Sequence, residues 1–292
     1  MNRNDIQSYA GSTGAVLIGA ALALAGSQGS VAAFGGVPLF AVCVAVVFLI
    51  QWVAYVPSAL AKTEKYYDLT GSLTFAVVTL TALFAAGRYD AQSLLVAGLV
   101  LTWAVRLGTF LFGRVRRAGE DRRFREIKRS ASRFLLAWTL QGLWVSVTAA
   151  AALAAITARK PGEPGALGVV GAGVWALGFG IEAVADMQKR RFAADPANRS
   201  RFIATGLWSL SRHPNYFGEI LVWIGVALIA FPSLEGWALV TLISPVFVTV
   251  LLTRISGVPL LERAADEKWG GQEDYEAYKR STPVLIPKLR SR

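Results

Sequence analysis

The chain contains few of the residues that build metal centres and disulfides. Its 292 residues include one cysteine, Cys43, and one histidine, His213. A single cysteine excludes an internal disulfide, and this pair alone excludes the usual Cys/His metal constellations. Any metal would have to be held by carboxylates only, so we predict no metal site.

Charged residues are also scarce. They make up 17% of the chain, whereas 54% of the residues are hydrophobic, and the mean hydropathy is +0.46. Soluble domains carry about 25% charged residues, so the surplus apolar surface indicates lipid as the solvent. The net charge of +11 could suggest nucleic acid, but the basic residues lie between apolar segments rather than along one soluble face. We expect no nucleic-acid partner.

Long apolar stretches run through most of the chain. A membrane helix needs about 20 apolar residues, and eight stretches approach that length: Thr13–Ala33, Pro38–Ala61, Leu69–Gly87, Gln92–Gly113, Phe134–Ala158, Gly165–Ala185, Phe217–Phe231 and Gly236–Leu252. The last two are short and read as a tight helical hairpin. The first could be a signal peptide, but its start is weakly charged, so we interpret it as a span. The pattern predicts an all-α, polytopic membrane protein with about seven or eight spans.

Lysines and arginines alternate between the two sides that these spans define. One side, which includes both termini, carries 26 of the 30; the other carries three, and Arg106 lies inside the fourth stretch. Basic residues concentrate in cytoplasmic loops. We therefore predict that both termini are cytoplasmic.

No sequence feature divides the chain. There is no fixed repeat and no long Ser/Pro-rich linker, so we predict one integral membrane domain over residues 1–292. The small residues Gly171, Gly173, Gly178 and Gly180 fit close helix packing. They do not form a Rossmann fingerprint, because no Gly-x-Gly-x-x-Gly follows a strand.

Polar residues gather at the mouth of the seventh stretch, in Ser211–Glu219. If this segment is helical, Arg212, Tyr216 and Glu219 share one face, and Asn215 is adjacent. Glu219, in the first turn of an apolar span, must pair or line a polar cavity. Arginines at a helix start, where N–H groups are free, favour phosphates. The alternative is an interfacial turn with snorkelling arginines and an aromatic belt.

Four further groups have both a structural and a functional interpretation. Arg106 needs a partner or a cavity, unless it snorkels to an interface. Asp68, beside Tyr67 at the edge of the third span, either caps a helix or presents a proton to a substrate. Asp186 and Arg190 stand four residues apart, as in a surface ion-pair ladder. Tyr275 and Tyr278 either cover a flat ring or anchor the chain at the interface.

Several ordered motifs together resemble the steroid 5α-reductase-like membrane reductases, in their bacterial branch. The segment Gly206–Glu219 is similar to that family's signature. Further matching segments, in the same order, are Trp103–Leu107, Gly119–Arg123, Asp186–Pro196 and Ser256–Glu262. The resemblance covers roughly Asp68 to Pro287. It implies an N-terminal part, residues 1–65, outside the main resemblance, and a reductase-like core, residues 66–292, whose cofactor site lies mainly in residues 180–292.

The resemblance implies NADPH, bound from the cytoplasmic side of a bacterial inner membrane. The residues on the family's cofactor-binding segments are Arg106, Asp186, Arg190, Arg201, Trp208, Arg212, His213, Asn215, Tyr216, Glu219, Arg254, Glu262, Tyr275 and Tyr278. Asp68 stands at the position of a glutamate that meets the substrate carbonyl. Trp103 stands where the family has a tyrosine, and Tyr67 or Tyr55 would compensate.

The expected reaction is reduction of a carbon–carbon double bond conjugated to a ketone, in a lipophilic, steroid-like enone. Membrane lipids are expected partners, and no obligate protein partner is evident. One alternative is an S-adenosylmethionine-dependent membrane methyltransferase of the isoprenylcysteine or phospholipid type, which has a similar Arg-His-Pro-x-Tyr element. Another is a lipid-binding or transport protein without a cofactor.

Overall fold

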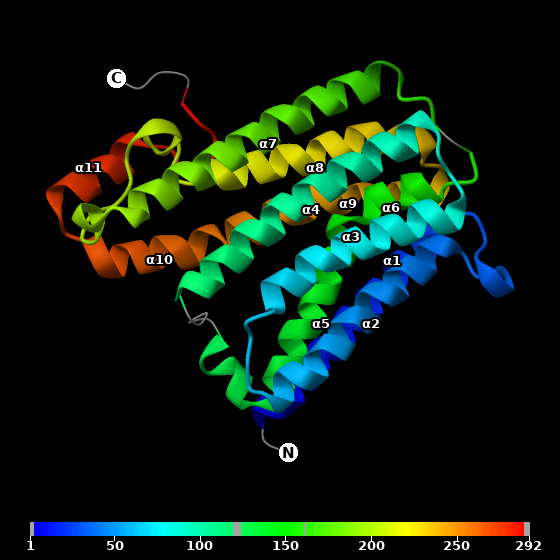
Figure 1. The fold of residues 1–292 in the computed structure, drawn as a ribbon, viewed down its shortest axis with the longest axis horizontal. Helices are drawn as coiled ribbons and strands as arrows, with labels where there is room; N and C mark the ends of the chain where they lie inside the picture. Colours follow the sequence, from blue (N-terminus) through cyan, green and yellow to red (C-terminus); the bar gives the residue numbers. More distant parts are fainter. Residues whose placement is uncertain (1–2, 119–123, 161, 289–292) are drawn as a thin grey trace. The chain divides into compact units, whose positions relative to one another are not determined.

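Most of the residues that the structure describes are helical. The computed structural model describes residues 3–118, 124–160 and 162–288. Within these ranges, extended residues pair only in two isolated bridges, Ser30 with Ala158 and Ala32 with Pro38. The prediction of an all-α fold is confirmed (Figure 1).

The helices follow one another with short connections. In chain order they are α1 (Arg3–Gly26), α2 (Leu39–Leu60), α3 (Tyr67–Ala86), α4 (Ala91–Ala118), α5 (Ala131–Thr148), α6 (Ala150–Thr157), α7 (Gly165–Ala194), α8 (Pro214–Ala230), α9 (Ile243–Val250), α10 (Val258–Trp269) and α11 (Glu273–Ser281). Short 3-10 turns join several of them, and a π-helical turn, Leu251–Ile255, links α9 to α10.

The number of spans agrees with the sequence. Seven helical stretches in the described ranges are long and apolar enough to cross a membrane, and the bent pair α5–α6 provides an eighth if it counts as one span. The chain is therefore a polytopic membrane protein with seven or eight spans, as predicted. The last stretch, Gly236–Trp269, continues well beyond the apolar run on which its prediction rested. The first helix likewise begins ten residues before the predicted span, because Arg3–Ser12 is polar but still helical.

The predicted fifth span is bent rather than straight. Its two halves, α5 and α6, meet at Ala149 at an angle of 56°. Near the break, the Ser146 hydroxyl donates to the carbonyl of Gly142 at 2.8 Å, an arrangement that often bends helices. The carbonyl of Thr148 accepts a hydrogen bond of 2.5 Å from the Ser244 hydroxyl. This bond occupies a carbonyl that the bend removes from the regular helical ladder.

The chain divides into two compact units. The first comprises Met1–Gly168 with Val226–Ser244, and the second comprises Val169–Gly225 with Pro245–Arg292. The single domain expected from the sequence stays a prediction.

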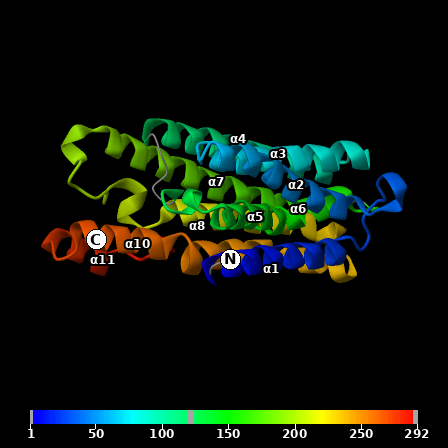
Figure 2. The same cartoon turned by 90° about the horizontal axis from the view of Figure 1, so that it is seen from below.

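The first unit contains most of the membrane helices. Helix α3 packs against α4 and α2, and α5 packs against α2 and α1. Figure 2 shows these helices from below, with α3 beside α4. Trp103 on α4 is fully buried and meets Phe75 on α3 edge to face, with ring centroids 5.1 Å apart. Trp103 is thus part of the apolar core of this unit.

The second unit is built on the close approach of α7 and α8. A Cβ added to Gly178 would lie 2.6 Å from the carbonyl oxygen of Gly218, and one added to Gly225 would lie 2.6 Å from that of Gly171. Such distances exclude any side chain, so these glycines let the two backbones touch. Gly173 and Gly180 do not take part, because nothing lies within 4 Å of a Cβ built on either.

Candidate functional site

The C-terminal tail holds the segment that leads into α8. The Ser211 side chain is fully buried, and its hydroxyl donates to the carbonyl of Leu285 at 2.8 Å. The backbone N–H of Arg212 donates to the carbonyl of Pro283 at 2.9 Å. Pro214 is the first residue of α8, a position where the missing N–H costs nothing. The turn before α8 is therefore held by the tail rather than by its own sequence alone.

Glu262 on α10 is the centre of the buried polar network. Its carboxylate forms an ion pair with Arg212 through Nη1. Its other oxygen lies 2.7 Å from Nε2 of His213. The side chains of His213 and Glu262 are 6% and 22% exposed, so water is largely excluded from this contact. With an ionised Glu262, the Nε2–H tautomer of His213 donates to the carboxylate.

A stacked pair covers one face of the histidine. The rings of His213 and Tyr216 have centroids 5.7 Å apart and an interplanar angle of 8°. A Cβ on Gly257 would lie 2.9 Å from a ring carbon of Tyr216. The glycine in Ser256–Gly257–Val258 therefore lets the chain pass directly over this ring.

Helix α7 contributes the second polar contact. The amide nitrogen of Asn215 donates to a carboxylate oxygen of Asp186 at 3.3 Å, and Asp186 is only 6% exposed. Glu182, one turn earlier on α7, is 2% exposed. Glu219 is half-buried on the first turns of α8. The second unit thus holds two neighbouring groups of contacts, Arg212, His213 and Tyr216 around Glu262 and Asn215 with Asp186.

Three atoms of this network have unfilled hydrogen-bonding capacity. Among the described side chains, Nε of Arg212, Nδ1 of His213 and Oδ1 of Asn215 are fully buried and have no hydrogen-bond partner. Buried polar groups are nearly always paired in folded proteins. A donor and two acceptors therefore remain for polar groups that are not part of the chain.

The tyrosines of α11 belong to an aromatic core. The Tyr278 hydroxyl donates to the carbonyl of Trp208 at 2.6 Å, and the Tyr275 hydroxyl donates to Asp266 at 2.9 Å. Phe202 contacts both rings with centroids 5.3 Å away. Burial raises the pKa of Tyr278 to about 12, and burial together with Asp266 raises the pKa of Tyr275. These contacts favour a structural role over that of an exposed platform for a ring.

Trp208 is also internal. It is 3% exposed, and its indole N–H donates to the carbonyl of Ala185 at 3.0 Å. The ammonium group of Lys189 lies 4.6 Å from its ring centroid. Arg190, Arg201 and Arg254, by contrast, have exposed side chains. The structure leaves these three arginines at the surface of the second unit, outside the buried network.

The candidate catalytic residues lie in the first unit. Asp68 is half-buried in the first turn of α3. The hydroxyl groups of Tyr67 and Tyr55 donate to the carbonyls of Ala137 and Ala131, at 2.9 and 3.2 Å. Arg106 is half-buried on α4. Both tyrosine hydroxyls are thus engaged by the backbone of α5.

One buried ion pair near these residues was not predicted. Glu64 is 3% exposed, and its carboxylate lies 2.7 Å from Nζ of Lys128. The two residues are 64 positions apart, so no local pattern links them. The Glu64 carbonyl also accepts a 2.9 Å hydrogen bond from the backbone of Tyr67. The pair therefore connects the start of α3 to the connection that precedes α5.

The motif Gly119–Arg123 lies outside the described residues. In the described ranges, His, Cys, Asp and Glu side chains form no group of three or more that could hold a metal ion.

The fold and the site together indicate the general class of protein to which the chain belongs. The chain is a helical integral membrane protein with a buried polar network at the start of one membrane helix. Residues 54–282 match the family model described as "Protein of unknown function (DUF1295)", so the chain belongs to that family. No curated protein and no solved structure matches the chain.

Proposed function

We propose that this protein is an NADPH-dependent membrane reductase acting on the conjugated double bond of a lipophilic, steroid-like enone. The observation that carries the proposal is the buried network of Arg212, His213, Asn215 and Glu262, with three polar atoms still lacking partners. The ordered resemblance to steroid 5α-reductase-like reductases supports the same conclusion. Burying polar and charged groups costs free energy, and a lipid-binding protein without a cofactor would not explain why these groups are buried together.

The residues present fit a dinucleotide. Arg212 offers a buried donor, and Asn215 and His213 offer buried acceptors that suit a carboxamide or a ribose hydroxyl. The exposed guanidinium groups of Arg190, Arg201 and Arg254 are suited to bind the phosphate groups of the dinucleotide. When bound, NADPH supplies the hydride that reduces the β-carbon of the enone.

The chain's own groups have defined tasks in this proposal. Glu262 holds Arg212 and His213 in fixed positions, so that both side chains are oriented before a ligand arrives. The apolar helices exclude water. Asp68 hydrogen-bonds the substrate carbonyl as enolate charge develops, provided that its carboxyl is protonated. Tyr67 or Tyr55 assists Asp68 at the carbonyl, and their present bonds to α5 hold both rings against the cluster of Phe124, Phe134 and Trp138.

The proposed location follows from the charge pattern. Because 26 of 30 lysines and arginines fall on one side of the predicted spans, we assign that side to the cytoplasm, where NADPH is available. The bacterial character of the resemblance favours the inner membrane.

Cofactor titration tests the proposal. Full-length protein in detergent is titrated with NADPH and, separately, with S-adenosylmethionine, and its thermal unfolding is followed. We expect stabilisation by NADPH that rises with ligand concentration. Stabilisation by S-adenosylmethionine alone would support the methyltransferase instead.

Two variants sharpen this test. Asn215→Ala should weaken NADPH binding, whereas Asn198→Ala, a second-unit change outside the network, should leave it unchanged. Asp68→Asn should retain NADPH binding and slow NADPH oxidation by a 3-oxo-4-ene steroid used as a probe. Undiminished oxidation by this variant would remove Asp68 from the mechanism.

A further inference from the structure

The C-terminal part of the chain lies alongside the turn that precedes α8, within the second unit. The backbone N–H of Arg212 donates to the carbonyl of Pro283 at 2.9 Å, and the backbone N–H of Lys288 donates to the carbonyl of Leu210 at 3.0 Å. The tail segment, Pro283–Lys288, is thus bonded to the turn at both of its ends. These two bonds join backbone groups only, so they do not depend on the side chains of the tail.

Ser211 links the middle of the tail segment to His213. Its side chain is fully buried, and its hydroxyl donates to the carbonyl of Leu285 at 2.8 Å. The same oxygen accepts a 3.2 Å hydrogen bond from the backbone N–H of His213. A serine hydroxyl has one proton and two lone pairs, so one atom serves both the tail and the histidine. Ser211 therefore connects the tail directly to a residue of the candidate site.

Arg212 and His213 are the two residues whose side chains contact Glu262. Their backbone N–H groups donate to the carbonyl of Pro283 and to the Ser211 hydroxyl, and both residues precede α8. Each also has a side-chain nitrogen that is fully buried and lacks a hydrogen-bond partner in the described part of the chain. The tail segment therefore fixes the backbone that carries two of the polar atoms available to a ligand.

The tail segment contributes backbone groups rather than large buried side chains. Val284 and Ile286 are 38% and 69% exposed. Thr282, just before the segment, is buried, and its backbone N–H donates to the carbonyl of Tyr278 at 2.9 Å. The segment thus leaves the end of α11 from an anchored residue. Because its exposed side chains gain little from docking, its hydrogen bonds to Leu210–Arg212 hold it in place.

We propose that the tail segment is a working part of the NADPH site and that Ser211 is the positioning residue through which it acts. Ser211 holds the backbone of His213, so it sets where the ring nitrogens lie when the cofactor arrives. The role rests on the proposed function, and it adds that the affinity for NADPH depends on the docked tail.

Variants at Ser211 test this role. In full-length protein in detergent, Ser211→Ala should raise the dissociation constant for NADPH roughly three- to thirtyfold, up to the value of the two hydrogen bonds lost. Ser209→Ala removes a hydroxyl whose bond stays within its own turn, to the carbonyl of Gly206, and should leave the constant unchanged. Calorimetric titration well below the unfolding temperature measures both values. Equal affinity of Ser211→Ala and the unaltered protein would overturn the proposal.

A matched pair isolates the hydroxyl if the site tolerates little change in volume. Ser211→Thr and Ser211→Val add nearly the same bulk at this buried position, but only threonine keeps the hydroxyl. The threonine variant should bind NADPH at least threefold more tightly than the valine variant. Equal affinities would show that the bonds of the hydroxyl are irrelevant to the cofactor, which overturns the proposal.

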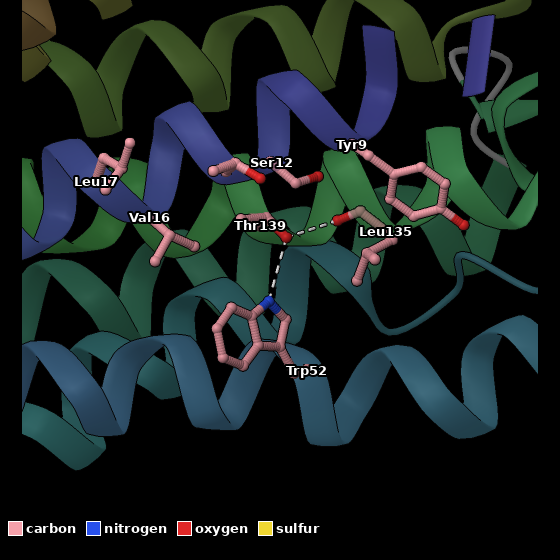
Figure 3. A pocket seen from close by; sticks show the side chains of 8 residues that line it. Tyr9, Ser12, Val16, Leu17, Trp52, Leu135 and Thr139 are labelled. Carbon is pink, nitrogen blue, oxygen red and sulfur yellow. Dashed lines mark hydrogen bonds between the residues drawn. The ribbon is translucent and has the colours of Figure 1, made fainter. Parts of the chain in front are cut away.

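Thr139 in the first unit provides a control with the same bonding pattern. Its hydroxyl donates to the carbonyl of Leu135 at 2.9 Å and accepts from the Trp52 indole at 3.1 Å, and Figure 3 shows Trp52 pointing toward it. Thr139→Val therefore removes equivalent bonds from a groove that the candidate cofactor residues do not line. It should leave NADPH affinity unchanged. A loss as large as that in Ser211→Ala would mean that any destabilisation weakens NADPH binding, and the proposal would fail.

The tail itself is tested at Lys288. Lys288→Pro removes the N–H that bonds to Leu210, and it should weaken NADPH binding roughly two- to tenfold. Lys288→Ala keeps that N–H and should bind NADPH more tightly than the proline variant. Equal affinities of the two variants would contradict the role of the docked tail.

Kinetic constants separate positioning from a general loss of fold. In NADPH oxidation with the 3-oxo-4-ene steroid probe, Ser211→Ala should raise the KM for NADPH and leave the KM for the probe unchanged. Partial unfolding instead lowers the concentration of active protein, so it reduces the apparent kcat and leaves both KM values unchanged. The second pattern would assign Ser211 a purely structural role and overturn the proposal.

Hydrogen exchange distinguishes a failure of this role from a failure of the proposed function. Without ligand, backbone exchange across Leu210–Tyr216 should be faster in Ser211→Ala than in Ser209→Ala, because the turn is released from the tail. Faster exchange in a protein whose unaltered form binds no NADPH would overturn the proposed function and, with it, the role in cofactor binding. Unchanged exchange in a protein whose unaltered form binds NADPH would overturn the role of the tail alone.

Discussion

Nε2 of His213 lies 2.7 Å from Oε1 of Glu262, although 49 residues separate them in the chain. The neighbouring Arg212 binds the other oxygen of the same carboxylate. One acid on α10 therefore fixes the side chains of two consecutive residues before the start of α8. The arrangement makes Glu262 the residue on which the geometry of the candidate site depends.

Replacing Glu262 should disturb the site more than its partial exposure suggests. Glu262→Ala leaves two largely buried nitrogen groups without their acceptor, which costs roughly 1–3 kcal/mol per group. We expect a lower thermal unfolding temperature in detergent and a loss of NADPH stabilisation. Glu267→Ala, an exposed change on the same helix, should alter stability by about 0.5 kcal/mol or less. Equal effects of the two substitutions would contradict the role given to Glu262.

Two glycine substitutions should act in opposite directions. In Gly218→Ala the new Cβ would lie 2.6 Å from the backbone nitrogen of Glu182, so α7 and α8 must separate, at a cost of about 1–3 kcal/mol. Gly180→Ala meets nothing within 4 Å and should stabilise α7 by up to about 1 kcal/mol, because alanine favours helix. Unfolding temperatures of the two variants in the same detergent provide the comparison. A harmless Gly218→Ala would rule out the close backbone contact.

Tyr278 should make the protein sensitive to alkali. Its pKa is raised to about 12 by burial, whereas an unfolded tyrosine titrates near 10. The raised pKa contributes stability that is fully present below pH 10 and is lost as the pH rises toward 12. Tyr278→Phe should remove this part of the alkaline loss while costing about 1 kcal/mol at neutral pH, for the bond to Trp208. Unfolding temperatures of both proteins between pH 8 and 11 would reveal it, and parallel profiles would speak against it.

The ion pair between Glu64 and Lys128 should be a stability determinant of the first unit. Lys128→Met removes the cation from a carboxylate that is 2% exposed, and breaking a buried pair in this way costs about 3–5 kcal/mol. Adding Glu64→Gln to this variant should recover part of the loss, because the buried charge is then removed. Lys65→Met, at an exposed position nearby, is the matched control. No recovery in the double variant would mean that the two side chains are not energetically coupled.

The spans were predictable from the sequence, but their distortions were not. Apolar runs such as Leu69–Gly87 predicted helices close to those observed. The 56° bend at Ala149 escaped prediction because the apolar run continues through it, while the Thr148 carbonyl beside it is bonded to Ser244, almost a hundred residues away. The helical start of α1 was missed because polarity was taken as the end of a span, although polar residues continue a helix readily.

The candidate site was predictable in part. The polar segment Ser211–Glu219 was visible, and the structure pairs its Arg212 and His213 with Glu262, its Tyr216 with the His213 ring and its Asn215 with Asp186. Spacing alone suggested that Tyr275 and Tyr278 could cover a ring, whereas their hydroxyls are used by Asp266 and Trp208. The sequence could not reveal this, because the partners come from other elements.

The sequence by itself determined that this protein is helical, that it crosses a membrane seven or eight times and that its polar chemistry gathers at the mouth of α8. Hydrophobicity and charge act residue by residue along the chain, so they can be read without a fold. Only the tertiary structure decided that Arg212 and His213 share Glu262, that Glu64 meets Lys128 and that Gly178 faces Gly218. Those contacts depend on how each helix is rotated about its axis, which packing between distant segments sets.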